Sequence, residues 1–301
     1  MPIIIPQDIP AFDILSKENV FVMGELRAQT QDIRPIEIAI VNLMPTKIET
    51  ETQLIRLLSN SPLQINLTLV KTASYKSKHV QEHHMNKFYK SFAQIKDSFF
   101  DGMIVTGAPV ETLEFEDVTY WKELCKIMDY ANERVTSTIY VCWGAQAALY
   151  HHYGIGKYPL DKKMFGIFPN RAHIQYDPLL KGLDDHFCVP HSRHTSVDEA
   201  ALYAHPELCV MASGETCGVS IAKSRDNSKL FFFGHSEYDR ETIKDEYLRD
   251  IKKGLAIDRP INYFIGEGTD SINMSWKSTG NLLFYNWLNY YVYQVTPFKF
   301  T

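Results

Sequence analysis

A cysteine stands at a predicted junction between a strand and a helix, in the stretch STIYVCWGAQAALYHHYG. The residues before Cys142 are β-branched and aromatic, as in a buried strand, and those after it are small helix formers. A bend of this kind exposes a nucleophile, and the first amides of the helix favour both a thiolate and an oxyanion beside it. The backbone N–H of Trp143 is a candidate oxyanion donor, and Gly144 permits a close backbone approach. The local pattern also fits a buried cysteine at the end of a core strand.

A histidine and a glutamate that could serve this cysteine occur far along the chain, in the stretch LFFFGHSEYD. His235 follows an apolar strand, and Glu237 comes two residues later, where an extended backbone would turn both side chains to one side. His235 could take the thiol proton while Glu237 fixes the imidazole tautomer and stabilises its charged form. His-x-Glu alone also fits a solvated loop. Together with Cys142, it favours a Cys-His-Glu triad.

The remaining histidine groups predict no metal site. His79, His83 and His84 include an i, i+4 pair, and His151 with His152 ends another predicted helix. Neither group matches H-E-x-x-H or carries an obvious third ligand, and a zinc site needs several converging ligands. The stretch TGAPVE has no Walker lysine and no G-x-G-x-x-G, so no nucleotide-phosphate cradle is indicated.

The composition is that of a globular protein with a small-molecule partner. The 301 residues are 45% hydrophobic and 22% charged, and the formal net charge of -5 is spread without blocks of one sign. This pattern indicates neither a nucleic-acid surface nor a membrane surface. Without a secretory signal or an apolar stretch of ~20 residues, a cytoplasmic location is expected. Five cysteines without C-x-x-C pairing favour free thiols.

Strand and helix patterns alternate through the first half of the chain. Residues 36–44, 99–109 and 137–142 predict buried strands with amphipathic helices between them. The alternation predicts an α/β three-layer sandwich with a mainly parallel sheet and a ligand crevice at the carboxyl ends of the strands, where Gly107 and Cys142 fall. Beyond residue 156, short strands suggest antiparallel hairpins added to the sheet, and two helices are expected to close the chain. Residues 1–35 are expected to form an N-terminal arm on a single catalytic domain of residues 36–301.

The cysteine corner and the distant His-x-Glu resemble the class I glutamine amidotransferase fold, which is flavodoxin-like. More closely, four stretches are similar to the homoserine O-acyltransferases of methionine biosynthesis, a family of O-succinyltransferases and O-acetyltransferases: NLMPTKIETETQ, VTGAPVE, YVCWGAQAALYHHYGI and GHSEYD. The resemblance covers nearly the whole chain. The amidotransferases usually carry glycine two residues before the cysteine, whereas this chain has Tyr140. That departure argues against glutamine hydrolysis.

The resemblance implies a ping-pong acyl transfer. Cys142 would form an acyl-thioester with the acyl group of acyl-CoA, with His235 as general base and Glu237 as its partner. Backbone amides near Trp143 and the Gly107 turn would hold the oxyanion. The family also implies a homodimer, and three residues that contact homoserine: Lys163, Ser192 and Arg249.

The residue after GAPV is associated in this family with the acyl donor, glutamate with acetyl-CoA and glycine with succinyl-CoA. Here it is Glu111, whose carboxylate would occupy space and repel the distal carboxylate of a succinyl group. The expectation is therefore a homoserine O-acetyltransferase that uses acetyl-CoA as co-substrate and holds no permanently bound cofactor. A succinyltransferase, a glutamine-hydrolysing enzyme and a catalytically silent metabolite-binding protein stay open as alternatives.

Overall fold

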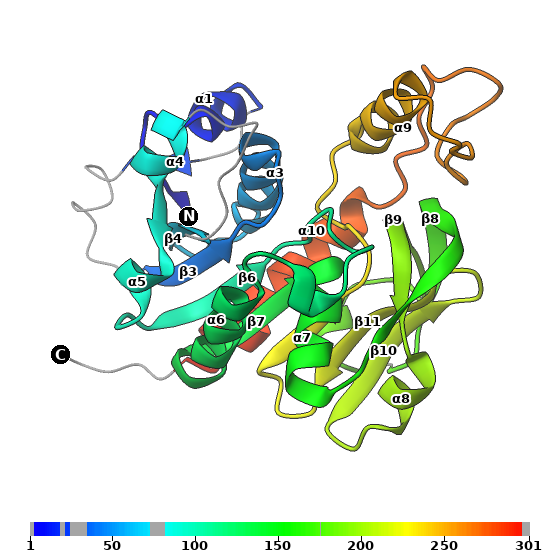
Figure 1. The fold of residues 1–301 in the computed structure, drawn as a ribbon. Helices are drawn as coiled ribbons and strands as arrows, with labels where there is room; N and C mark the ends of the chain where they lie inside the picture. The colour runs from blue at the N-terminus through cyan, green and yellow to red at the C-terminus, as the bar shows by residue number, and fades with distance from the viewer. Residues whose placement is uncertain (1–2, 19–21, 25–34, 73–81, 175, 297–301) are drawn as a thin grey trace.

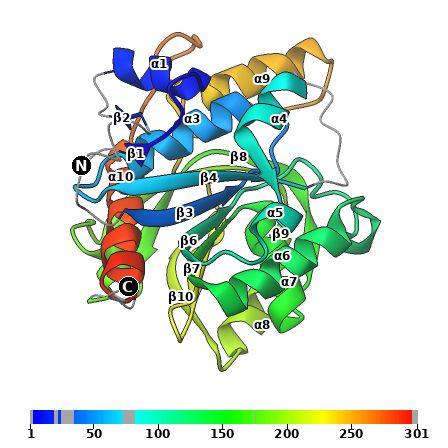
Figure 2. The same ribbon diagram turned by 90° about the vertical axis from the view of Figure 1, so that its left-hand side faces the viewer.

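One mixed sheet organises the molecule (Figure 1). In this computed structural model, residues 3–18, 22–24, 35–72, 82–174 and 176–296 are described. Within them, twelve strands form the sheet, and eleven follow the order β2-β1-β4-β3-β6-β7-β12-β11-β10-β8-β9, while β5 pairs with β4. Several helices lie against the two faces of this sheet, as the two views together show (Figure 2).

The centre of the sheet is parallel and carries the predicted apolar strands. These are β3 (Ile36–Val41), β4 (Ile65–Lys71), β6 (Phe100–Val105) and β7 (Val135–Val141), each in parallel register with its neighbour. Strand β3 is a nearly continuous apolar run, whereas β4 alternates apolar with polar residues. All residues of β6 are buried because both faces of the sheet are covered. The prediction of an α/β fold with a largely parallel sheet is confirmed.

Helices cover the sheet on both faces, which gives three layers. On one face, α3 (Lys47–Leu58), α10 (Lys277–Asn286) and the π-helical segment η3 (Trp287–Tyr293) bury their apolar side chains against alternate residues of the central strands. On the other face, α6 (Trp121–Arg134) and α7 (Trp143–Tyr153) pack on the intervening strand residues. The period-two alternation of the strands therefore divides the core into two clusters.

Antiparallel strands extend the sheet beyond β7, as the short strands late in the sequence suggest. The connecting strand is β12 (Lys229–Phe232), which pairs in parallel with β7 and antiparallel with β11. The others are β8 (Lys157–Ala172), β9 (His186–Val197), β10 (Leu208–Gly214) and β11 (Gly218–Ser224). A small third core cluster packs α9 (Thr242–Lys252) against β8.

The first described residues join the opposite edge of the sheet. Strand β1 (Ile3–Ile4) pairs in parallel with both β4 and β2 (Val22–Met23), and helix α1 (Pro10–Lys17) lies on α3. The arm is tied further into the molecule by Arg56 of α3, whose guanidinium lies 2.5 Å from carboxylate oxygens of both Glu18 and Asp239. The division into an arm and one catalytic domain stays a prediction.

Shorter elements complete the described part of the chain. They are α4 (Glu82–Phe88), β5 (Tyr89–Ser91), α5 (Phe92–Ile95), η1 (Phe115–Asp117), η2 (Pro178–Leu180) and α8 (Glu199–Ala204). In the residues that the structure describes, none of the helices has the length and apolar character needed to span a bilayer.

Candidate active site

Cys142 occupies a strained corner between β7 and α7. Its backbone has φ 50° and ψ −115°, a positive φ that few residues other than glycine adopt. The corner is held on both sides, because the N–H of Cys142 donates to the carbonyl of Phe232 at 2.7 Å and its own carbonyl accepts from Ala145 and Gln146. Strain of this kind persists only where the surrounding structure fixes it, and it is concentrated at functional sites.

The start of α7 lies unusually close to the neighbouring strand β6. A methyl group on Gly144 would stand 2.7 Å from the carbonyl oxygen of Thr106, so only glycine lets the helix begin here. The amides of Trp143 and Gly144 open the helix and have no intrahelical acceptor. Because the ring of Trp143 is buried, its contribution to an oxyanion hole can come only from this backbone N–H.

His235 and Glu237 follow β12, the strand next to the one that ends at Cys142. The backbone N–H of His235 donates to the carbonyl of Pro190 at 2.8 Å, and its Nδ1 lies 2.7 Å from Oε1 of Glu237. Burial opposes charging of the imidazole, but interactions with the thiolate of Cys142 and with Glu237 outweigh it, so the pKa of His235 lies well above its ordinary value. This arrangement can hold a thiolate and imidazolium pair.

Gly107, at the carboxyl end of β6, leaves the space in front of the nucleophile open. A methyl group there would stand 3.3 Å from Cβ of Cys142 and 3.7 Å from Cε1 of His235. The thiol and the imidazole therefore border the same small volume. Although Cys142 is 8% exposed and touches the core, it lies beside His235 and not in hydrocarbon alone. The alternative of an isolated core cysteine does not describe this environment.

The side chain of Tyr238 lies between the predicted triad and a second polar cluster. Its ring stacks on the imidazole of His235, with centroids 4.2 Å apart and planes 11° from parallel. Burial, followed by the negative charges of Glu246 and Glu237, raises the pKa of Tyr238 well above its ordinary value. Tyr238 therefore stacks on His235 and also lies within the electrostatic influence of Glu246.

The second cluster gathers the three residues that the family resemblance assigns to homoserine. Lys163 Nζ lies 2.7 Å from Oε1 of Glu246, Ser192 Oγ lies 3.0 Å from both carboxylate oxygens, and Arg249 Nη2 lies 3.4 Å from Oε1. Asp250 also contacts Lys163 and Arg249. Sequence reasoning missed Glu246, although its place three residues before Arg249 on one helix face was a usable signal.

A buried cation that the sequence analysis also missed lies behind the nucleophile. Arg193 is 1% exposed, and it donates to the carbonyls of Thr195 at 2.8 Å and Cys217 at 2.6 Å. Burial lowers the pKa of Arg193, while the charge of Cys142 opposes that shift. The guanidinium therefore adds positive potential on the thiolate side of the site.

The loop that carries Glu111 is fixed from the start of β8. Lys157 Nζ donates to the backbone carbonyls of Glu111 and Leu113, both at 2.8 Å, and lies over the ring of Phe115. The loop follows Gly107 directly, so it belongs to the same edge of the sheet. The Glu111 side chain is half-buried.

Of the histidines set aside in the sequence, His84 has a structural partner. Its Nε2 lies 3.1 Å from the fully buried carboxylate of Glu51, which also accepts from Tyr89 at 2.7 Å. In the same cluster, burial lowers the pKa of Lys47 to about 8. His79 lies outside the described residues. These contacts satisfy His84 without a metal ion.

The chain is similar to known proteins over nearly its whole length. A family model described as homoserine O-succinyltransferase matches residues 2–298. A homoserine O-acetyltransferase of Shouchella clausii is 52% identical, covering 99% of this chain and 97% of that protein, and one of Acetivibrio thermocellus is 54% identical, covering 99% and 98%. A solved glutamine amido transferase from Methylobacillus flagellatus aligns with a TM-score of 0.55 at 13% identity, over 85% of this chain and 95% of that chain. That likeness supports the predicted fold.

The contact between Glu237 and His235 leads to a prediction about the protonation of the His235 imidazole. Removing the carboxylate charge in Glu237→Gln should lower the pKa of His235, because one of the two negative charges that favour the imidazolium is lost. As pH rises, the ring should therefore lose its proton earlier than in the unmodified protein. NMR titration of the labelled imidazole measures this, with Glu215→Gln, an exposed glutamate, as the matched control. An identical titration curve in Glu237→Gln would contradict the pairing.

Proposed function

Since the chain belongs to the homoserine O-acyltransferase family, we propose that it transfers the acetyl group of acetyl-CoA to homoserine by way of a thioester on Cys142. Its activity is that of a homoserine O-acetyltransferase, the name carried by relatives more than half identical over nearly the whole chain. The observation that carries the mechanism is the strained Cys142 corner beside an imidazole paired with Glu237.

In the first half-reaction, the Cys142 thiolate attacks the carbonyl carbon of acetyl-CoA. A C–S bond forms, and the negative charge moves to the carbonyl oxygen, where the first amides of α7 and the Gly107 turn would stabilise it. When the tetrahedral intermediate collapses, the bond to the CoA sulfur breaks. The His235 imidazolium gives its proton to the departing thiolate, so CoA leaves as the thiol and the enzyme keeps the acetyl group.

In the second half-reaction, neutral His235 accepts the proton of the homoserine γ-hydroxyl. The hydroxyl oxygen attacks the thioester carbonyl, and collapse of the new intermediate releases O-acetylhomoserine and the Cys142 thiolate. The imidazolium formed in this step is held by Glu237, whose carboxylate stays ionised throughout. The cycle thus restores the thiolate and imidazolium pair with which it began.

Homoserine is a zwitterion, and the cluster around Glu246 offers a charge for each end. We assign the substrate ammonium to the carboxylate of Glu246 and the substrate carboxylate to Arg249 and Lys163. Both cations already lie within 3.4 Å of Glu246, so the substrate would exchange existing ion pairs for new ones. The side chain of Arg249 is 53% exposed, and its guanidinium can turn toward an incoming carboxylate. Ser192 would help to orient the bound substrate.

Acetyl-CoA is the donor that the Glu111 loop favours, although the matching family model carries the succinyl name. A carboxylate near the acyl pocket leaves room for a methyl group but repels a second carboxylate. Two such charges ~4 Å apart at an effective dielectric of 20 repel by about 4 kcal/mol. Lys157 supports this role because it fixes the loop through two backbone carbonyls. The homodimer and the cytoplasmic location that the sequence suggests stay predictions.

The covalent step is tested by incubating the protein with acetyl-CoA in the absence of homoserine. The intact mass should increase by one acetyl group that hydroxylamine removes, and addition of homoserine should yield O-acetylhomoserine. Cys142→Ser should lose the label and lower turnover by about a thousandfold or more. The matched control is Cys125→Ser, a half-buried thiol on α6, which should keep both. Acetyl transfer at the usual rate by Cys142→Ser would remove the proposed nucleophile.

The assignment of Glu246 predicts a defect in one half-reaction only. Glu246→Gln should lower kcat/KM for homoserine by about tenfold to a hundredfold, the equivalent of one charged hydrogen bond. Thioester formation from acetyl-CoA should be unchanged, because the ammonium is absent in that step. Steady-state and single-turnover kinetics separate the two. Glu241→Gln, on an exposed glutamate at the start of α9, is the control. Equal kcat/KM values for Glu246→Gln and the control would exclude the ammonium contact.

The donor preference depends on the charge at position 111. Glu111→Gly should raise the ratio of succinyl-CoA to acetyl-CoA use by about tenfold or more, since both the bulk and the repulsion are removed. Glu114→Gly removes an exposed glutamate from the same loop and should leave the ratio unchanged. Measuring kcat/KM for both donors gives the ratio directly. If Glu111→Gly and Glu114→Gly behave alike, the carboxylate does not select the donor.

A further inference from the structure

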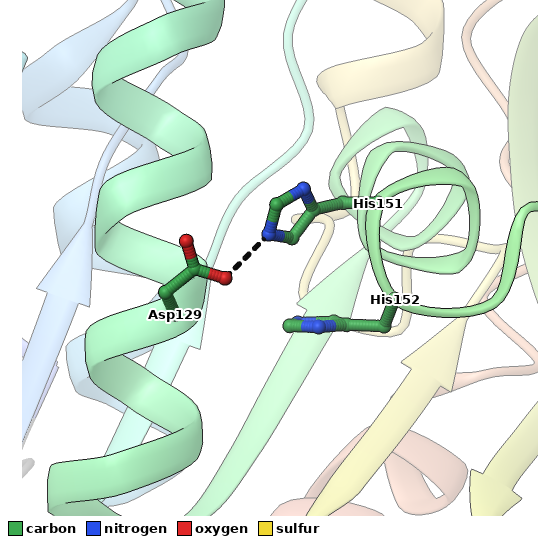
Figure 3. A group of neighbouring side chains, drawn as sticks. All are labelled: Asp129, His151 and His152. Carbon is green, nitrogen blue, oxygen red and sulfur yellow. Dashed lines mark hydrogen bonds and ion pairs between the residues drawn. The ribbon is translucent and has the colours of Figure 1, made fainter.

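Two histidines and an aspartate that the mechanism does not use meet between α6 and α7 (Figure 3). His151 and His152 reach from the last turn of α7 toward Asp129 of α6. Nε2 of His151 lies 2.6 Å from Oδ1 of Asp129, and one ligand atom from each of the three residues lies within 4.8 Å of the others. The sequence suggested no third ligand for the histidine pair, because Asp129 comes from a separate helix.

The donor set has the chemistry of a transition-metal site. Two imidazoles and one carboxylate are ligands that Zn²⁺ binds at about 2.0–2.2 Å, with water in the remaining position. His152 contributes a buried Nε2 for which no hydrogen-bond partner is found among the described residues.

Two features of the surroundings favour a cation at this place. Both histidines lie in the last turn of α7, where the carbonyl ends of the helix carry partial negative charge. The indole of Trp121 packs edge-on against the ring of His151, with centroids 6.4 Å apart and planes 89° from parallel, which restrains that imidazole. The Asp129 side chain is 60% exposed, so it can rotate to admit an ion while one side stays open to water.

We propose that Asp129, His151 and His152 form a binding site for a divalent late transition-metal ion, with Zn²⁺ the best match. The ion would replace the direct contact between His151 and Asp129 and connect α6 to α7. The site is separate from the chemistry, because the 11 residues of α7 place Cys142 and His152 at opposite ends of a helix about 16 Å long. Its expected effect is on stability and not on acyl transfer.

The test is Zn²⁺ titration by calorimetry, in a Cys142→Ser background that removes the active-site thiol as a competing ligand. In that background, His151→Ala and Asp129→Asn should each weaken Zn²⁺ binding by about tenfold or more. His186→Ala, on an exposed histidine of β9, should leave it unchanged. Bound Zn²⁺ should also raise Tm in the background protein and in the His186→Ala control, and less so in the two ligand variants.

Two controls keep the result decisive. Tm measured in EDTA shows whether each variant folds as the background does, and Asp129→Asn is nearly isosteric at an exposed position. Co²⁺ substitution gives an independent readout, since its visible absorption reports nitrogen ligands and should change in His152→Ala. Equal Zn²⁺ affinity in the ligand variants and the His186→Ala control would overturn the proposal. So would the absence of binding by the background protein at a Zn²⁺ concentration about 100 times the Kd of a micromolar site.

Discussion

The parallel pairing of β7 with β12 is the constraint on which the rest of the structure depends. Val141 and Phe232 are partners in that ladder, and the N–H of Cys142 donates to the carbonyl of Phe232, so the nucleophile and His235 leave neighbouring strands at the same level. β6 lies on the other side of β7 and ends at the turn of Gly107. Gly107, Cys142 and His235 are far apart in the sequence, but the backbone hydrogen bonds of the sheet bring them to the same end of three neighbouring strands. The loops beyond these strand ends supply the remaining polar groups.

The ionisable groups at this edge are buried only because they compensate one another. An isolated charge in such a place would be neutralised by a shift of its pKa, whereas the imidazolium of His235 is stabilised by a thiolate and a carboxylate. The cluster around Glu246 follows the same principle with two cations and a second carboxylate, Asp250. A zwitterionic substrate suits this cluster, because the substrate brings one charge of each sign and leaves the net charge of the cluster unchanged.

Sequence patterns were sufficient for the parts governed by local rules. The strand patterns predicted the central sheet, and the Cys142 corner and the His235 motif follow two strands that are neighbours in it. What depends on tertiary packing was missed. Glu246 is one acidic residue among several on the polar face of α9, and Asp129 meets His151 only because α6 and α7 lie side by side. The spacing of Glu246 and Arg249 indicates their own ion pair, but no periodicity specifies that Glu246 meets Lys163 and Ser192 of the strands.

The guanidinium of Arg56 joins Glu18, at the end of the first helix, to Asp239, two residues beyond Glu237. The segment that ends at Glu18 is therefore linked to the segment that carries His235, although the two are far apart in the sequence. A chain that begins after Glu18 would lose this ion pair together with the pairing of β1 with β4. Arg56 would then keep Asp239 as a partner on one side and leave its former contact with Glu18 to solvent.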